Sequence, residues 1–449
     1  MTRIEAENYI YQSYLRAAKF QSYDDKDSNK RDPSITEELI KSLSQTPCTV
    51  VTGSKGKGSV ANMISSVLQS VMPVGLMTSP HLVDFCERIR FNGCNISDED
   101  LIHYIEELKP IFDSIDASLP SNRYISPMGI QTAIALRFFQ DRQTQFNVFE
   151  CGKGAQYDDV NNITHDYAVI NSIFLEHTRE LGETLSAIAS DKANVIRRGM
   201  KCVYVAQQQP EALDVIVKRA KDCKVEIKFY GKDFRCENIR FCQQGMNFNI
   251  IIDNHTVYTN LSIPLLGEHQ ARNCALALAL CHDVLGSFNL ETLKCSLAGL
   301  SCPGRMEVLS SSPFVLLDAC INRESCNQVL QVLQHLGIGR FTALIGIPDD
   351  KDFIGVAEKM YHHASRILLT QSHNPHYCFS EFQKKMLSDL NIDSKWFDDI
   401  VKGVQFALTF DEPLVILGTT SVVSEAHALF SEKERFSESN TMSGIFSVK

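Results

Sequence analysis

The stretch from Thr49 to Val60 constrains this chain more than any other part of its sequence. A short run of Thr and Val leads into a loop with three glycines and two lysines, and apolar residues then recur at helical spacing. A buried strand that passes through such a loop into a helix points backbone N–H groups and the positive end of the helix dipole at one place. The stretch therefore predicts a cradle for phosphate groups. Its candidate nucleotide contacts are Gly53, Ser54, Lys55, Gly56, Lys57, Gly58 and Ser59.

Two residues of this loop have predicted chemical roles. Lys57 supplies a positive charge for the β and γ oxygens of a nucleotide, and Ser59 supplies a hydroxyl for Mg²⁺. The loop is shorter than the common G-x-x-x-x-G-K-[ST] motif and has an extra glycine before the serine. A chance glycine-rich turn is the alternative, but the order of strand, loop and helix favours the cradle.

Composition excludes several classes of protein. A chain of 449 residues is long enough for two or three domains. No apolar run reaches the ~18 residues that span a bilayer, and the N-terminus lacks the apolar core of a secretion signal. The net charge of −10 argues against a nucleic-acid partner. Fifteen cysteines without a Cys-x-x-Cys pair indicate reduced thiols in the cytoplasm, neither a disulfide framework nor a zinc site.

Strand-like and helix-like segments alternate along most of the chain, which predicts an α/β fold with a mostly parallel sheet. Four short alternating segments at about 225–266 predict a small antiparallel sheet added to the first domain. The expected domains are a P-loop ATP-binding domain at 1–302 and a smaller C-terminal Rossmann-like α/β domain at 303–430. A polar, Ser-rich tail at 431–449 is expected to be disordered. The predicted strands are 74–77, 146–150, 167–174 and 202–205 in the first domain and 314–318, 342–347, 366–370 and 414–418 in the second.

Further motifs follow the glycine loop in a fixed order, up to about Ser421. They are Thr78-Ser79-Pro80-His81-Leu82, Glu87-Arg88-Ile89, Glu150-x-Gly152-x-Gly154, His177 with Leu181-Gly182, Asp191-Lys192-Ala193, Leu266-Gly267-x-His269-Gln270 with Asn273, and Pro303-Gly304-Arg305-Met306-Glu307. In this order they resemble the Mur ligase superfamily, and within it the dihydrofolate synthase and folylpolyglutamate synthase branch. The resemblance implies transfer of the γ-phosphoryl group of ATP to a substrate carboxylate, after which an amine displaces phosphate to form an amide. Such catalysis depends on positioning and charge neutralisation.

The resemblance also implies roles for single residues. The candidate catalytic residues are Lys57, Glu150, His177 and Lys192. The candidate ligands are Ser59 and Glu150 for a first Mg²⁺ ion, and Ser79 and His177 for a second. Lys192 would be carbamoylated by CO₂, which replaces a cation that would repel the metal. The simpler alternatives are an exposed helix lysine for Lys192 and a turn histidine for His177.

The resemblance places Asn273 near the adenine, and Arg305 and Asp318 of the second domain near the phosphates and ribose. A second domain that closes over ATP would exclude the water that hydrolyses an acyl phosphate. The simpler alternatives are a helix-surface amide for Asn273 and a polar strand end for Asp318.

The sequence departs from the family on the acceptor side. The branch reads Asp-Gly-Ala-His-Asn-Pro where this chain has Asp318-Ala319-Cys320-Ile321-Asn322-Arg323, so isoleucine replaces a histidine that the family uses around the incoming amino acid. The arginine of Gly-Gly-Arg-x-Asp-Ala-Thr-Asn is missing from 154–161, and Glu176-His177 replaces an Asp-His pair. The candidate substrate contacts are Arg88, Asn322, Arg323, Thr419 and Ser421. Arg323 is interpreted first as a solvated cation at a helix start, and the hydroxyls after 418 as helix caps.

The leading hypothesis is therefore an ATP-dependent amide ligase that adds an amino acid, glutamate by resemblance, to a folate-type carboxylate. One alternative is the same chemistry on a different acid and amine. Another is a non-catalytic ATP-binding partner protein, against which the joint presence of Lys57, Glu150, His177 and Lys192 argues. The expected partners are small molecules, with no nucleic acid and no membrane, and a monomer is favoured.

Overall fold

The computed structural model describes residues 1–20, 26–242, 245–374 and 379–439, by backbone alone from 432 onward. The chain forms two compact units. The first contains Met1–Arg240, Met246–Pro264 and Glu268–Leu300, and the second begins at Ser301 but also includes Phe241 and Leu265–Gly267. Within the described ranges, no helix has both the length and the apolar character needed to cross a bilayer.

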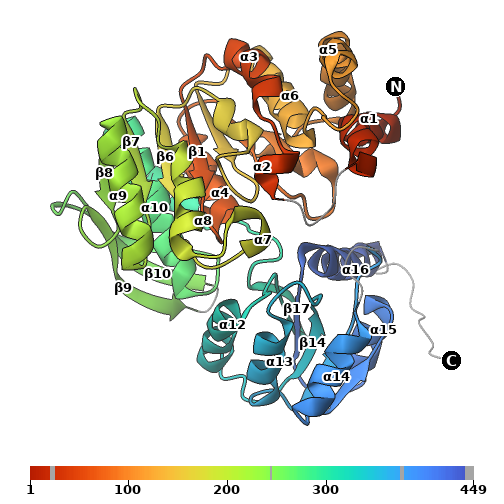
Figure 1. Cartoon of the computed structure of the whole chain (residues 1–449). Helices are drawn as coiled ribbons and strands as arrows, with labels where there is room; N and C mark the ends of the chain where they lie inside the picture. Colours follow the sequence, from red (N-terminus) through yellow and green to blue (C-terminus); the bar gives the residue numbers. More distant parts are fainter. Residues whose placement is uncertain (21–25, 243–244, 375–378, 440–449) are drawn as a thin grey trace. The chain divides into compact units, whose positions relative to one another are not determined.

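The first unit is built on an eight-stranded sheet with the order β4-β3-β2-β5-β1-β6-β7-β8 (Figure 1). Its strands are β1 Cys48–Thr52, β2 Val74–Met77, β3 Ile89–Phe91, β4 Cys94–Asn95, β5 Phe146–Glu150, β6 Tyr167–Ile170, β7 Cys202–Val205 and β8 Glu226–Phe229. All pairs are parallel except β2 with β3 and β3 with β4. In the register, Val51 lies opposite Glu150 on one side and Val169 on the other. The carboxyl ends of β5, β1 and β6 therefore meet at one edge, where the glycine loop begins.

Helices surround this sheet. They are α1 Arg3–Ala17, α2 Asp27–Lys30, α3 Ser34–Leu43, α4 Lys57–Leu68, α5 Asp98–Ser118, α6 Pro127–Asp141, α7 Thr178–Leu181, α8 Leu185–Lys192, α9 Pro210–Cys223, α10 Glu268–Leu285 and α11 Leu290–Ala298. The helix that follows the glycine loop, α4, packs on α10 and on β5. The predicted α/β class and the mostly parallel sheet are confirmed.

The segment at 225–230 differs from its prediction. It was expected in the small antiparallel sheet, but β8 pairs in parallel with β7 at the edge of the large sheet, with Ile227 opposite Val203. The physical reason is the intervening α9, which gives the long crossover that parallel neighbours require. The small sheet has three strands, β9 Phe234–Cys242, β10 Gly245–Ile252 and β11 Thr256–Ile263.

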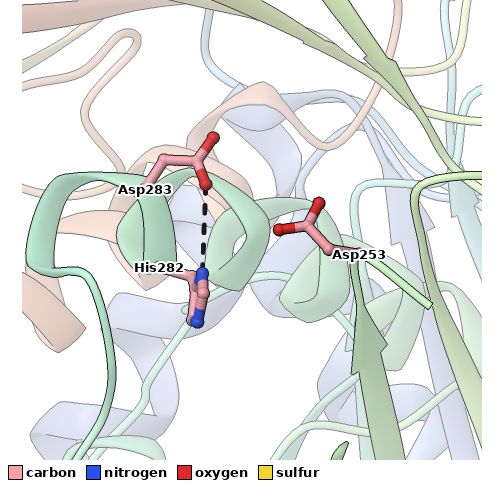
Figure 2. A group of neighbouring side chains, drawn as sticks. All are labelled: Asp253, His282 and Asp283. Carbon is pink, nitrogen blue, oxygen red and sulfur yellow. Dashed lines mark ion pairs between the residues drawn. The ribbon is translucent and has the colours of Figure 1, made fainter. Parts of the chain in front are cut away.

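A cluster of charged residues joins this small sheet to α10. Asp253 follows β10, and His282 and Asp283 lie near the end of α10 (Figure 2). Lys228 of β8 reaches into the cluster, with its Nζ 3.3 Å from Asp253 Oδ1 and 2.8 Å from Asp283 Oδ2. The cluster therefore ties the edge strand, the small sheet and α10 together.

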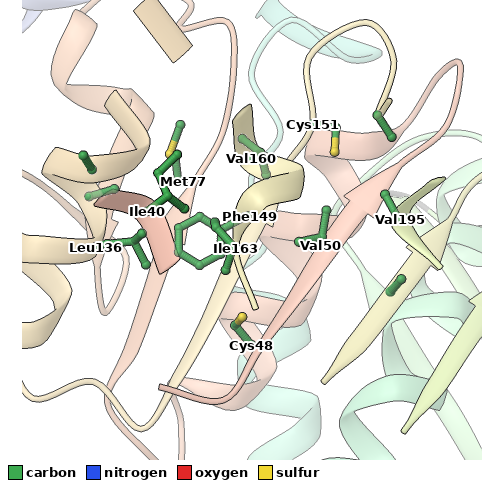
Figure 3. Packing of buried hydrophobic residues seen from close by; sticks show 14 of the residues in the cluster. Ile40, Cys48, Val50, Met77, Leu136, Phe149, Cys151, Val160, Ile163 and Val195 are labelled. Carbon is green, nitrogen blue, oxygen red and sulfur yellow. The ribbon is translucent and has the colours of Figure 1, made fainter. Parts of the chain in front are cut away.

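Apolar side chains fix the strands on which the glycine loop depends. Val50, Met77 and Phe149 come from three neighbouring strands and pack with Ile40 of α3 and Leu136 of α6 (Figure 3). All five are almost completely buried. Burial of side chains of this size is worth ~1.5–3 kcal/mol each. The ends of β1 and β5 are thus held by the core, while the loops that follow them are free to carry polar groups.

The second unit has a six-stranded sheet with the order β12-β13-β17-β14-β15-β16. Its strands are β12 Glu307–Ser311, β13 Phe314–Asp318, β14 Thr342–Gly346, β15 Arg366–Leu369, β16 Ser394–Trp396 and β17 Leu414–Gly418. Its helices are α12 Arg323–His335, α13 Phe353–Tyr361, α14 Glu381–Asp389, α15 Ile400–Ala407 and α16 Thr420–Ser439. Only β12 runs antiparallel to its neighbour. The predicted smaller α/β domain is confirmed.

Two residues from before Ser301 complete the core of this second unit. Leu266 is buried in its apolar cluster, and the ring of Phe241 stacks on His335 with 3.9 Å between ring centroids. The core of the second unit is therefore assembled from three separate stretches of chain.

The predicted disorder of the tail at 431–449 stays a prediction, because the backbone is described only to Ser439. α16 continues to Ser439, because the residues after Ser431 include Glu, Lys and Arg, which favour a helix. The remaining tail, 440–449, lies outside the described residues.

Candidate active site

The glycine loop is shaped by close neighbours as well as by backbone freedom. Gly53 has a φ of +140° and Gly56 a φ of +78°, which other residues adopt only with strain. A Cβ atom would lie 2.8 Å from Asn171 Cβ at Gly53, and 2.6 Å from Asn171 Nδ2 at Gly56. At Gly58 it would lie 3.2 Å from Glu150 Oε2. The loop is therefore pressed between the ends of β5 and β6, with its backbone at the edge of the sheet.

Two lysine side chains converge on one carbonyl of this loop. Lys57 Nζ donates to the carbonyl oxygen of Gly53 at 3.1 Å, and Lys192 Nζ donates to the same oxygen at 3.0 Å. Lys192 Nζ also donates to the carbonyl oxygen of Lys153 at 2.6 Å and lies 2.9 Å from Glu176 Oε1. These two positive charges at the start of α4 make the loop attractive to an anion.

Lys192 is completely buried, so the alternative of an exposed helix lysine is wrong. Burial lowers the pKa of Lys192, and the neighbouring Glu176 carboxylate opposes this shift. Its ammonium group is nevertheless fully used, by one carboxylate and two carbonyl oxygens.

Glu150 brings a carboxylate to the same place. It ends β5, is almost completely buried, and its Oε2 accepts a hydrogen bond from the backbone N–H of Ser79 at 3.0 Å. Ser59 follows Gly58 in the first turn of α4 and is also buried. A carboxylate and a hydroxyl are hard oxygen ligands, so this donor set fits a Mg²⁺ ion. Ser79 reaches Glu150 through its backbone.

Ser54 and Lys55 complete the loop. The Ser54 hydroxyl donates to the carbonyl oxygen of Phe174 at 3.2 Å, and its backbone N–H donates to that of Ser172 at 2.9 Å. Burial, with the charges of Lys55 and Arg272 adding to it, lowers the pKa of His269 to about 3. This motif histidine of α10 is therefore neutral beside the loop at ordinary pH.

Asn273 lies against the loop and is buried, so the alternative of a helix-surface amide is wrong. Its Oδ1 accepts from Asn171 Nδ2 at 3.0 Å, and its Nδ2 donates to Gln270 Oε1 at 3.2 Å. A Cβ atom at Gly56 would lie 3.1 Å from Asn273 Nδ2. Sequence reasoning missed Asn171 because the strand predicted at 167–174 included it, whereas β6 ends at Ile170 and Asn171 directly follows it.

His177 lies at the entrance of α7 in a left-handed backbone conformation, with a φ of +46°. Its Nδ1 is 3.9 Å from Glu180 Oε2, and the other carboxylate oxygen of Glu180 lies 2.8 Å from Lys153 Nζ. Burial would raise the pKa of Glu180, but the hydrogen bond and charge of Lys153 outweigh it, and the net shift is downward. Glu180 and Lys153 were not among the predicted residues.

Arg88 is held near Glu150 by neutral partners. Its Nε donates to His81 Nδ1 at 2.8 Å, and its Nη1 donates to Gln131 Oε1 at 2.9 Å. Burial lowers its pKa, with the Glu150 charge among the opposing influences. A guanidinium group held by neutral groups keeps its charge for an anionic ligand.

Within the described ranges, one group of acidic and histidine side chains has the spacing of a metal site, and it is the cluster of Asp253, His282 and Asp283 in Figure 2. None of the predicted metal ligands belongs to it. Both carboxylates already accept hydrogen bonds from Lys228 Nζ, and Asp283 also accepts one from the hydroxyl of Tyr204. The cluster is therefore interpreted as a structural tie.

In the second unit, the candidate nucleotide contacts are bonded locally. Asp318 is buried at the end of β13, and its Oδ2 accepts from the backbone N–H of Met306 at 2.9 Å. Arg305 Nη1 donates to the carbonyl oxygen of Gly304 at 3.1 Å. These bonds fix the turn that carries Arg305 against the strand that carries Asp318.

The candidate substrate residues of this unit have partners within the same unit. Asn322 caps α12 by accepting from the backbone N–H of Ser325 at 2.9 Å, and the side chain of Arg323 forms an exposed ion pair with Glu358. Thr419 is buried and its backbone N–H donates to Gly346, while the Ser421 hydroxyl accepts from Asn374 at 3.4 Å. The predicted substrate roles of these residues stay predictions.

Comparison with known proteins gives a consistent result. Residues 51–281 match the family model described as the Mur ligase middle domain. The folylpolyglutamate synthase of Lacticaseibacillus casei is 27% identical over 379 residues, which are 83% of this chain and 87% of that protein. The dihydrofolate synthase/folylpolyglutamate synthase of Bacillus subtilis is 29% identical over 394 residues, which are 84% of this chain and 88% of that protein.

Solved structures show the same fold. The folylpolyglutamate synthase of Mycobacterium tuberculosis, complexed with ADP and AMPPCP, has a TM-score of 0.85 at 22% identity and covers 95% of this chain and 99% of its own. An FPGS–AMPPCP–folate complex has a TM-score of 0.79 at 25% identity, and covers 96% of this chain and 100% of its own.

Proposed function

Because this chain belongs to the Mur ligase family, we propose that it is an ATP-dependent ligase that joins glutamate to a folate-type carboxylate through an acyl phosphate. Relatives named as folylpolyglutamate and dihydrofolate synthases match more than four fifths of the chain, and related solved structures hold an ATP analogue and folate. Those ligands are the substrates that we infer here.

One observation carries the proposal, which is the convergence of Lys57 and Lys192 on the glycine loop beside the buried Glu150. The loop N–H groups and Lys57 bind the phosphates of ATP, which is what such a loop does at a helix N-terminus. ATP binding alone would not need Lys57, Glu150, His177 and Lys192 together, which argues against a non-catalytic ATP-binding protein. Glu150 and Ser59 would hold Mg²⁺, which supplies neutralisation of phosphate charge when bound.

The proposed ligase reaction has two steps. A carboxylate oxygen of the acid attacks the γ-phosphorus of ATP, and ADP leaves. The amine of glutamate then attacks the acyl carbon, loses a proton, and phosphate leaves with the electrons of the C–O bond. Lys57 stays within reach of the transferred group, and positive charge here stabilises the transition state. Arg88 is the cation that we infer for the acid.

Carbamoylation of Lys192 is the finer part of the proposal. Its neutral amine would attack CO₂ and lose a proton, and its lowered pKa increases the neutral fraction. As an ammonium group, however, it is fully satisfied by Glu176 and two carbonyl oxygens. Intact-mass measurement with and without bicarbonate tests this step, because carbamoylation adds the mass of one CO₂. If activity does not respond to bicarbonate and the mass does not change, Lys192 is not carbamoylated.

A ligase that acts on a different acid and amine is the second candidate. The specific observation in its favour is Ile321, which stands where the branch has histidine and carries no polar group for an amino acid. This change leaves the glycine loop and Glu150 untouched, so it affects the choice of substrate and not the phosphoryl transfer.

The test is phosphate release from ATP and Mg²⁺ with matched pairs of acid and amine. Dihydropteroate or folate with glutamate is expected to release phosphate and to give one amide per phosphate. Turnover only with another pair would support the second candidate. No phosphate release with any pair, while ATP still binds, would contradict ligase function.

A further inference from the structure

Lys153 carries a positive charge into the candidate active site at a position that the family motif leaves open. The motif reads Glu150-x-Gly152-x-Gly154, and Lys153 occupies its second variable place. Its carbonyl oxygen accepts from Lys192 Nζ at 2.6 Å, and Lys192 in turn donates to the glycine loop. The backbone of Lys153 is therefore two hydrogen bonds away from the phosphate cradle.

The same loop has lost the cation that the family places there. Gln156 stands where the branch has arginine, and its side chain is exposed and donates to the hydroxyl of Tyr157 at 3.3 Å. A neutral amide that is turned to its neighbour cannot neutralise a carboxylate. Lys153, three residues earlier, supplies the positive charge of this loop.

The side chain of Lys153 lies within range of a second cation, Lys30, as well as of its partner Glu180. Lys30 lies close enough for the charge of Lys153 to contribute to the lowered pKa of Lys30, after burial, which is the larger cause. The charged groups that act on Lys30 are Lys153, Arg31, Asp27 and Glu180. The side chain of Lys153 is partly exposed, at 29%, so an incoming anion can reach it.

We propose that Lys153 is a specificity-determining residue that binds a second carboxylate of the acid substrate, so that acids already carrying a glutamate are preferred over acids with a single carboxylate. This inference rests on the proposed function. In the free protein Glu180 holds the place of that carboxylate, with its Oε1 2.8 Å from Lys153 Nζ. The incoming carboxylate shares or replaces this contact, while the other carboxylate of the acid receives the phosphoryl group.

The test measures binding separately from turnover. Calorimetry gives Kd for pteroate, which has one carboxylate, and for folate, which has two, and steady-state kinetics gives KM for the corresponding acids. K153M is expected to weaken folate by about tenfold, as for loss of a bond to a charged group, and pteroate by less than about twofold. K153R is expected to restore most of the folate affinity. K218M, which removes an exposed lysine of α9, is the matched control.

E180Q separates this role from a purely structural ion pair. Loss of the competing carboxylate is expected to tighten folate binding by about threefold. A structural pair predicts instead that K153M and E180Q lower Tm alike and shift both acids equally. Equal effects on pteroate and folate, or none, would overturn the inference. If wild type binds folate through Lys153 without turnover, the proposed function fails while the specificity role stands.

Discussion

The two units hold their candidate residues in different ways. In the first unit the candidates contact one another, since Lys57 and Lys192 share the Gly53 carbonyl and Asn273 is bonded to Asn171 behind Gly56. In the second unit no such shared contact links the described candidates: Asn322 accepts from the backbone of Ser325, Asp318 accepts from that of Met306, and Arg323 pairs with Glu358. The first arrangement links the candidate residues to one another around the glycine loop, and in the second Asn322 and Asp318 hold a helix start and a turn.

The difference shows where substitutions can accumulate without loss of the fold. Residues of the first unit are interlocked by burial and by shared partners, so few replacements are compatible with them. The loop at 318–323 needs only a cap and a buried strand end, so Ile321 and Arg323 can differ from the family. Changes at the candidate site residues of the first unit should therefore alter chemistry, and changes at those of the second should alter stability.

K57A is expected to have the largest effect. It removes a positive charge that already faces the loop carbonyl, and we expect kcat to fall by about 100- to 1000-fold, as for loss of one preorganised group at a transition state. Phosphate release measures the loss, and thermal unfolding should change little because a single partly buried hydrogen bond is removed. Undiminished product formation would contradict the contrast drawn between the two units. K218A, which removes an exposed lysine of α9, is the control.

D159N should remove a pH dependence of stability that belongs to the first unit. Asp159 is buried and accepts from the hydroxyls of Thr36 and Ser126, and burial raises its pKa from 3.8 to about 6. The folded state then binds more protons than the unfolded state between about pH 4 and 6, so stability falls as pH rises through this window. The expected change is about 3 kcal/mol, at ~1.36 kcal/mol per pKa unit.

Urea unfolding of wild type and D159N at pH 4, 5, 6 and 7 measures this difference. The variant is expected to give a flatter profile than wild type over this range. Burial also raises the pKa of the neighbouring Asp158, so a residual slope is expected from its carboxyl group. An identical slope in both proteins would show that the buried carboxyl does not titrate there.

N322A tests the second unit. Loss of this helix cap is expected to lower the free energy of unfolding by about 1 kcal/mol, while N322D should keep the cap. Denaturant unfolding measures both variants, and KM for the amino acid should stay within about twofold. A tenfold rise of that KM in N322A, with no loss of stability, would show that Asn322 contacts the substrate and does not act only as a helix cap.

R323A should have the smallest effect. Its ion pair with Glu358 is exposed, and exposed pairs contribute at most about 0.5–1 kcal/mol. A double-mutant cycle with E358A measures the pair directly. If KM for the amino acid rises strongly in R323A but not in E358A, Arg323 binds that substrate and the contrast between the units weakens.

Much of the fold could be predicted from local patterns. The bounds of β2, β5, β7, β13 and β17 agree with the predicted segments, because each is a short apolar run between clear turn residues. The placement of β8 could not be predicted from the sequence, because a half-exposed strand of four residues carries no signal for the sheet that it joins. The glycine loop and Glu150 could be predicted for the same reason, because they directly follow or end such short apolar strands.

Other site residues were hidden because their contacts depend on which strands become neighbours. Asn171 reaches Gly56 only because β6 lies beside β1 in the sheet. Lys153 lies in the loop after β5 and Glu180 lies in α7, 27 residues later, and the two meet through their side chains. No periodicity in the sequence could have paired them.

The two residues from before Ser301 that pack in the second unit affect where the protein can be cut into fragments. A cut at Ser301 would look clean along the chain, yet it would leave Leu266 and Phe241 on the wrong fragment. The C-terminal fragment would expose an apolar surface and leave the ring of His335 uncovered. No single cut in the chain therefore separates the second unit with its apolar core complete.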